Sequence, residues 1–304
     1  MLTTLANPIL PIFAILVLGY CLQRFGVFDV TVAQSINRFV FFVATPALIF
    51  SIISQAPIDQ FDLRALGLYF SAQVLVYVGT ALFMYRILKR EKGEALLLGM
   101  TATFVNHVFF VLPIAERVFG ASAAHPIAGI VLVDVGIVFC GSVLAVDLMR
   151  TEKPSPLKVV GLLVKNPFLI ASILGVLAWV AHPIVPQGVF TYAAFAGGAA
   201  APASLFALGI ILASNPLRPI GYATWSVVSA KVILHPVLVF IFSSFSVLSP
   251  GWSDMTLLVA AGPCGAMPFV IALHYGIKTD TIAKAILIST LFSLLTLSLL
   301  TAYI

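Results

Sequence analysis

Apolar residues in this chain occur in long runs, not in the alternating or one-sided patterns typical of soluble proteins. Each run has about 20 residues or more, which is the length that a helix needs to cross a bilayer. Transmembrane strands would give shorter, alternating segments, so the runs predict helices. The ten expected spans cover residues 5–23, 35–55, 64–87, 94–115, 124–149, 157–181, 189–213, 222–247, 254–275 and 280–302.

Composition agrees with an all-α integral membrane protein. The 304 residues are 61% hydrophobic and only 9% charged, whereas a soluble domain of this length needs far more polar surface. The three cysteines all fall in apolar runs and lack the spacing of a zinc site or a disulfide framework. We therefore expect no metal and no cofactor.

Basic residues mark one side of the membrane. Thirteen of the sixteen Lys and Arg lie in or beside the loops that follow odd-numbered spans, and only Arg64 and Arg117 lie on the opposite side. By the positive-inside rule the basic side is cytoplasmic. The pattern predicts a bacterial inner (plasma) membrane protein with both termini on the periplasmic or extracellular side. It also explains the basic pI without nucleic acid as a partner.

The two halves of the chain echo each other at an offset of 155 to 159 residues. The matching features are Asn7-Pro8 with Asn166-Pro167, residues 45–50 with 201–206, Pro113 with Pro268, and Gly120 with Gly276. Five spans per half is an odd number, so the second half would enter the membrane from the other side. We expect an inverted repeat made of residues 1–149 and 157–304, joined by a cytoplasmic linker at 150–156.

Spans 4 and 9 carry residues that a straight helix in lipid would avoid. Span 4 contains Asn106, His107 and Pro113, and the stretch from Gly262 to Pro268 in span 9 holds two glycines and two prolines. Proline removes a helical hydrogen bond and clashes with the preceding turn. Both spans are therefore expected to be broken. A proline kink with glycines for close packing is the simpler alternative.

Titratable residues also occur deep in spans 5 and 8. Asp134 lies near the centre of span 5, and Lys231 and His235 lie one turn apart in span 8. A charge at the bilayer centre costs about 2.5–3.5 kcal/mol, so it must be paired or face water. Asp134 and Lys231 could form a structural ion pair, or either could serve coupling or substrate charge. His107 is either a proton carrier or a neutral, hydrogen-bonded imidazole.

Small residues in span 7, "AGGAAAPAS" at 196–204, would allow another backbone to approach closely. We expect that backbone to be span 2, its counterpart in the first half.

With these motifs assembled, the chain resembles the auxin efflux carrier family, which includes bacterial malonate and malate carriers and the plant PIN-FORMED carriers. The quoted patterns are "VNHVFFVLP" (105–113) and "PCGAMPFVIALHY" (263–275). The resemblance implies a fold like that of bile-acid symporters and sodium/proton antiporters, with helices 4 and 9 crossing at their prolines. Spans 1, 2, 6 and 7 would form a scaffold, spans 3–5 and 8–10 a transport domain, and the scaffold a homodimer interface.

The resemblance also implies that a substrate carboxylate binds beside the crossing. His107 departs from the small residue that is common after the asparagine in the family. The candidate substrate-binding residues are Asn106, His107, Pro113, Pro263, Cys264, Gly265, Met267 and Pro268.

These observations predict a secondary active or facilitative transporter of a small organic anion that works by alternating access. Helix N-termini at a crossing favour negative charge, and Asn106 can donate hydrogen bonds to a carboxylate. No ATP-binding loop and no HExxH or GxSxG pattern is present, so an enzyme is not expected. A cation/proton antiporter on the same fold and a receptor that does not transport are the alternatives. Coupling to protons, to sodium or to no ion stays open.

Overall fold

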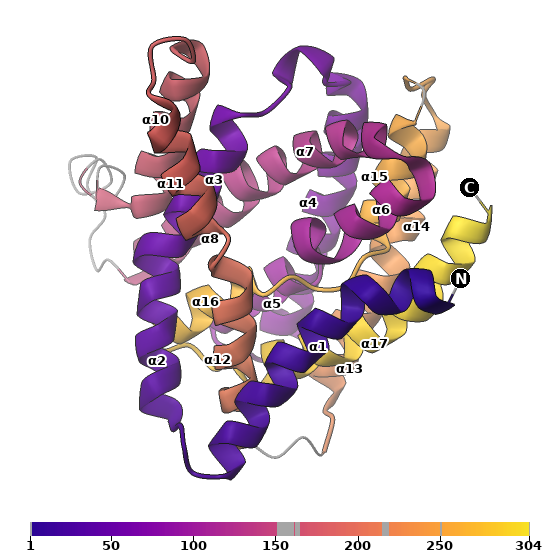
Figure 1. The fold of residues 1–304 in the computed structure, drawn as a ribbon. Helices are drawn as coiled ribbons and strands as arrows, with labels where there is room; N and C mark the ends of the chain where they lie inside the picture. The colour runs from indigo at the N-terminus through magenta and orange to yellow at the C-terminus, as the bar shows by residue number, and fades with distance from the viewer. Residues whose placement is uncertain (1, 151–160, 162–164, 215–218, 250, 304) are drawn as a thin grey trace.

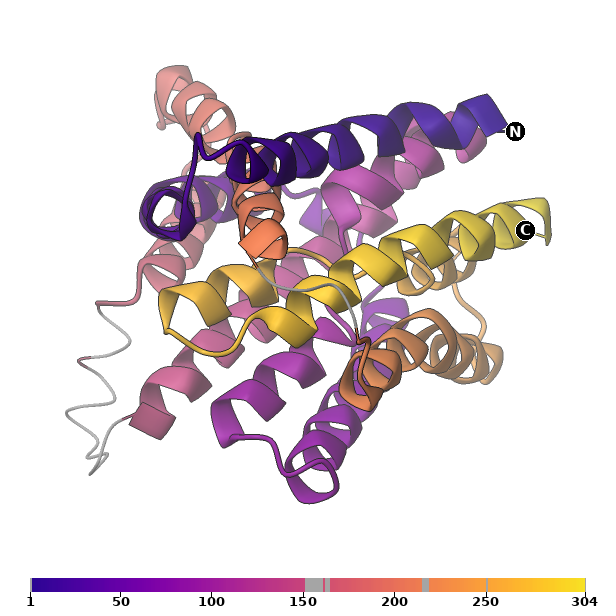
Figure 2. The ribbon, with the colours of Figure 1, turned by 90° about the horizontal axis from the view of Figure 1, so that it is seen from below.

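The computed structural model describes residues 2–150, 161, 165–214, 219–249 and 251–303, and within these residues all regular structure is helical. Figure 1 shows the helices packed into one bundle. The expected linker at 150–156 lies outside the described residues apart from Arg150. The first turn of α1 and the last turn of α17 lie at the same side of the molecule in both views (Figures 1 and 2).

The elements are α1 (Leu2–Arg24), α2 (Val30–Phe39), η1 (Val40–Ala44), α3 (Thr45–Ser54), η2 (Ile58–Gln60), α4 (Leu63–Arg86), α5 (Lys92–Thr101), η3 (His107–Val111), α6 (Leu112–Phe119), η4 (Ala121–Ala123), α7 (Ala124–Val133), η5 (Asp134–Phe139), α8 (Cys140–Arg150), α10 (Pro167–Val180), α11 (Gln187–Gly197), α12 (Ala200–Ser214), α13 (Tyr222–Ser229), η6 (Ala230–Leu234), α14 (His235–Ser244), α15 (Trp252–Ala260), α16 (Met267–His274) and α17 (Asp280–Tyr303). Of these, η1, η3, η5 and η6 are π-helical, with hydrogen bonds that span one residue more than those of an α-helix.

Within the described residues, six helical stretches are long and apolar enough to cross a membrane. They are Val30–Ser54, Leu63–Arg86, Ala124–Arg150, Gln187–Ser214, Tyr222–Ser244 and Asp280–Thr301. Two shorter apolar helices cover Ala14–Arg24 and Pro167–Val180. The remaining two expected spans are both interrupted, as expected: one at 261–266, among the glycines and Pro263, and one at 102–106, seven residues before Pro113. The count of ten spans and the repeat stay predictions.

Glycines allow the helices of spans 1, 2, 6 and 7 to pack closely. A Cβ on Gly197 of α11 would lie 2.7 Å from the backbone of Leu48 in α3, which confirms the expected contact between spans 7 and 2. A Cβ on Gly175 of α10 would also meet α3, at Ile53. Gly209 of α12 approaches the backbone of α1 closely enough to exclude any side chain.

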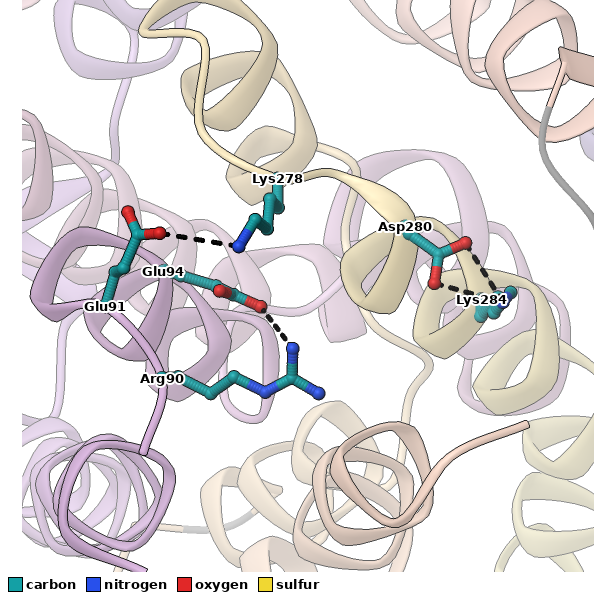
Figure 3. A network of polar contacts seen from close by, with 6 residues as sticks. All are labelled: Arg90, Glu91, Glu94, Lys278, Asp280 and Lys284. Carbon is teal, nitrogen blue, oxygen red and sulfur yellow. Dashed lines mark hydrogen bonds and ion pairs between the residues drawn. The ribbon is translucent and has the colours of Figure 1, made fainter. Parts of the chain in front are cut away.

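An ion pair joins the loop before α5 to the loop after α16 (Figure 3). Lys278, just after α16, lies 3.4 Å from the carboxylate of Glu91, just before α5. Both side chains are exposed, so this ion pair contributes little to stability. The half-buried hydrogen bond from Tyr275 Oη to Asp147 Oδ1, 2.7 Å long, also joins the end of span 9 to α8.

Candidate functional site

The two interruptions cross each other in the middle of the bundle. Val105 and Cys264 form an isolated antiparallel bridge. The Asn106 N–H donates to Pro263 O at 3.1 Å, and the Gly265 N–H donates to Phe104 O at 2.8 Å. The backbone groups that each break removes from its helix are thus satisfied by the other break, as a buried backbone requires.

The crossing does not run through all the prolines, contrary to the expectation from the resemblance. Pro263 lies at the crossing, whereas Pro268 lies in the first turn of α16 and Pro113 lies at the junction of η3 and α6. Proline is tolerated in a first turn, such as that of α16, because its missing N–H would have no helical partner there. Residues 104–106 and 263–265 therefore make the contact, and Pro113 and Pro268 lie beyond it in the second half-helices.

Glycine is required at the crossing because the two backbones touch. A Cβ on Gly265 would lie 2.7 Å from Val105 O, and one on Gly262 would lie 2.6 Å from a methyl group of Val111. Cys264 is buried, and its N–H donates to Ser289 Oγ of α17 at 3.1 Å. Pro263, Cys264 and Gly265 thus hold the geometry of the crossing.

A cavity of about 60 Å³ lies between this crossing and the helices of spans 2 and 7. Asn106, His107, Gly265 and Met267 line it from the crossing. Apolar side chains of α3, α7, α12 and η5 and the Thr45 side chain make most of the remaining wall. The cavity is mostly apolar with a few polar groups in fixed positions, which is typical of small-molecule sites.

Asn106 is the polar residue best placed to bind a ligand in this cavity. Its backbone is fixed by Pro263, and it directly precedes η3. Among the described residues, no side-chain hydrogen bond of Asn106 is found. An amide offers two N–H donors and one acceptor, so the side chain is available to a molecule in the cavity.

His107 and Asp134 form a buried pair beside the cavity. His107 Nε2 lies 2.8 Å from Asp134 Oδ2, and the two side chains are 3% and 0% exposed. Gln73 Nε2 of α4 donates to the other carboxylate oxygen at 2.6 Å. Three predicted spans meet at this carboxylate, which is the arrangement that a buried charge needs.

Lys231 takes a different partner from the one considered in the sequence. Its ammonium donates to Ala260 O, the last residue of α15, at 2.7 Å and lies 3.1 Å from His235 Nδ1. Asp134 is held instead by His107 and Gln73, so no ion pair joins Asp134 and Lys231 within the described residues. Both charges are fully buried and still interact through space.

Sequence reasoning missed two polar residues of this region, both on α4. Gln73 binds Asp134, and Tyr69 is fully buried with its ring 5.5 Å from the His235 ring. Gln73 could have been found from the sequence, because it is an amide near the middle of an apolar run. Tyr69 lies four residues before Gln73, so the two residues share one helix face and together indicate a polar site there.

Within the described residues, no group of three or more His, Cys, Asp and Glu side chains could hold a metal ion. Cys21, Cys140 and Cys264 carry free thiols.

Comparison with known proteins gives the family. The family described as "Membrane transport protein" matches residues 4–155 and 143–301. The chain belongs to this family. A protein of Rhizobium meliloti named "Putative malonate transporter" is 29% identical over 303 residues, covering 95% of this chain and 92% of that protein. "Uncharacterized transporter YfdV" of Escherichia coli K12 is 26% identical over 310 residues, covering 96% and 95%.

This membrane transport protein also shares its fold with a solved structure. The sodium proton antiporter MjNhaP1 from Methanocaldococcus jannaschii, at pH 8, superposes with a TM-score of 0.60 over 96% of this chain and 92% of the antiporter. At 17% identity the likeness shows the fold alone. The chain is therefore a multi-pass membrane transporter with an antiporter-like helical fold.

Proposed function

We propose that this transporter moves a small organic anion with a carboxylate group across the inner membrane by alternating access. The substrate binds in the cavity at the crossing, with its carboxylate against Asn106. Malonate is the first carboxylate to test, because it is named for the Rhizobium meliloti relative. The uneven distribution of Lys and Arg supports a membrane orientation with both termini outside.

The observation that carries the proposal is the free Asn106 side chain in the wall of the cavity. It stands at the start of η3, and Met267 at the start of α16 lines the same cavity. The first N–H groups of a helix have no partner in the helix and carry partial positive charge. A carboxylate here would meet an amide donor and two helix starts, while apolar walls accept its carbon chain.

The position of the cavity supports alternating access. One wall belongs to the crossing and η5, and the other belongs to α3 and α12. These walls belong to the two domains that the resemblance implies, the transport domain and the scaffold. Movement of one domain against the other would expose such a cavity to each side of the membrane in turn.

The test is a thermal-shift screen of carboxylates on purified protein, followed by flux of each hit in proteoliposomes. Asn106→Ala should weaken binding and lower flux about tenfold or more, because a hydrogen bond to a charged group contributes about 1.5–3 kcal/mol. Gln187→Ala is the matched control, since Gln187 is an exposed amide at the start of α11. This control should transport normally.

Two results would contradict the proposal. Normal flux through a folded Asn106→Ala protein would remove Asn106 from the binding site. Binding of a carboxylate without flux or counterflow would instead indicate a receptor.

A cation/proton antiporter is the second candidate, because Asp134 is a fully buried carboxylate beside the crossing. The breaks themselves, "ATFVN" and "AGPCGA", contain no Asp or Glu. Proton movement driven by a sodium gradient in the absence of any carboxylate would favour the antiporter.

A further inference from the structure

We infer that the His107–Asp134 pair takes up one proton when the organic anion enters the cavity, so that anion and proton cross the membrane together. The inference rests on the anion transport proposed above and adds the coupling ion. It comes from the position of one residue: among the described residues that line the cavity, His107 alone is titratable. His107 also contacts a buried carboxylate, that of Asp134.

The short distance between the two side chains requires a proton on one of them. At 2.8 Å, a bare imidazole nitrogen facing an ionised carboxylate would be repelled, so Nε2 or the carboxyl carries hydrogen. Gln73 Nε2 donates to the other oxygen of Asp134, and the His107 and Phe104 rings pack at a steep angle, with ring centres 5.8 Å apart. Both side chains of the pair are thus held in place by their neighbours.

Other titratable side chains surround the pair. Lys231 from η6 interacts with Asp134, His235 from α14 interacts with His107, and Tyr69 from α4 also interacts with Asp134. Cys264 lies near Lys231 at the crossing. The helices α1, α6, α7 and α15 also contact η3. Within their described residues, no charged side chain forms an ion pair with His107.

Charge balance decides which state binds an anion. With Lys231 charged, Asp134 ionised and both histidines neutral, the buried group has no net charge. A carboxylate added beside it brings uncompensated negative charge into a low-dielectric site, which disfavours binding. One proton on the pair gives imidazolium and carboxylate, and its positive charge compensates one carboxylate group of the anion. Anion binding and protonation thus favour each other.

His107 is better placed for this role than the other buried titratable groups. His235 directs Nδ1 to Lys231, and Lys231 is bound to Ala260 O. Neither residue is in the cavity wall, so a proton on either would lie farther from the anion. The proton on His107 comes from water in the open cavity and leaves to water once the cavity faces the other side.

The experiment uses proteoliposomes with a pH-sensitive dye inside, an inward malonate gradient and the membrane potential clamped. At about pH 8 malonate is fully ionised, so protons that enter with it are carried by the protein. The wild-type protein should acidify the lumen. His107→Gln and Asp134→Asn should lose this acidification. His125→Gln, which changes an exposed histidine of α7, should behave as wild type.

A second measurement needs no variant. Calorimetry of malonate binding in two buffers of different ionisation enthalpy should show uptake of about one proton per site by the wild-type protein. Malonate flux without acidification or proton uptake would overturn the coupling and leave anion transport standing. Acidification retained by both folded variants would overturn the role of the pair. Failure of malonate and every other carboxylate in the screen to bind or move would overturn the proposed function and this inference with it.

Discussion

At the scale of single residues, the crossing depends on the absence of side chains at Gly262 and Gly265. Each stands against the chain of span 4 at a distance that no Cβ tolerates. At the same contact, the Gly265 N–H donates a hydrogen bond to Phe104 O, and a shift of the backbone would break this bond. Glycine serves here for close approach and not for an unusual backbone angle.

Gly265→Ala is expected to destabilise the protein by about 1–3 kcal/mol, the usual cost of overpacking a core. Gly67→Ala in α4, where an added Cβ meets nothing within 4 Å, is the matched control. It should leave stability unchanged or raise it slightly, because alanine favours a helix. Thermal unfolding in detergent measures both. Equal melting temperatures for the two variants would show that the crossing tolerates a side chain.

The sequence predicts where polar residues lie but not which of them meet. Asn106, His107, Asp134 and Lys231 are conspicuous because each interrupts an apolar run. Their partners depend on how each helix is rotated about its axis, and runs that are apolar all round leave that rotation undetermined. The pairing of Asp134 with His107 instead of Lys231 could therefore be found only in the structure.

At the scale of helical elements, polar residues and π-helical turns occur together. His107, Asp134 and Lys231 lie in η3, η5 and η6, three of the four π-helical segments in the described residues. After η3 and η6, as after η1, a proline follows in the first turn of the next α-helix. Proline has no N–H to donate to the carbonyl of residue i−4 and its ring clashes with that carbonyl, and one extra residue in the preceding turn relieves the clash. The prolines thus account for most of the wide turns.

Helix ends outside the membrane are fixed by ordinary capping. Asp62 Oδ1 accepts hydrogen bonds from the N–H groups of Arg64 and Ala65 and caps α4, and Oδ2 accepts from the Ser249 N–H. Slight burial of the Asp62 carboxyl would raise its pKa, but the hydrogen bonds from Ser249, Ala65 and Arg64 outweigh it and hold the pKa below its usual value.

Asp62→Ala should lower the free energy of unfolding by about 1 kcal/mol, the typical loss for an N-cap. The pKa of Asp62 is lower in the folded state, so its contribution is complete above the ordinary aspartate pKa. It disappears as the pH falls through the lower folded value. Asp59→Ala, which changes an exposed carboxylate in η2, is the control. Denaturation of both variants measured against pH should show a difference that shrinks in acid, and a constant difference would contradict the titration.

At the scale of the whole molecule, the crossing links elements that are far apart in the sequence. Polar side chains in η3, η5 and η6 contact residues of α4, α14 and α15. Together they form one polar centre that is surrounded by apolar helices. An all-helical membrane protein with two interrupted spans was predictable, because long apolar runs and the glycines and prolines within them are visible in the sequence, whereas the count of ten spans and the repeat stay predictions. The exact position of the crossing was not predictable. Two broken segments pair through their backbones, and apart from the glycines such pairing requires no particular residue type.

One feature of this centre bears on the energy source of the transporter. Lys231 places its ammonium on the last carbonyl of α15, the negative end of a half-helix. In transporters with broken helices, such carbonyls are where a sodium ion is held. In this protein the position is filled by a cation that belongs to the chain and cannot dissociate.

Transport is therefore expected to continue at the same rate when external sodium is replaced by choline. Lys231→Ala should lose transport, or regain it only with a small monovalent cation that takes the vacated place, whereas Lys165→Ala, at an exposed position, should be unaffected. Flux with and without sodium decides the question, and a sodium requirement in the wild-type protein would contradict it. Because the Lys231 side chain takes the place of a sodium ion, the cell would move this solute without using its sodium gradient.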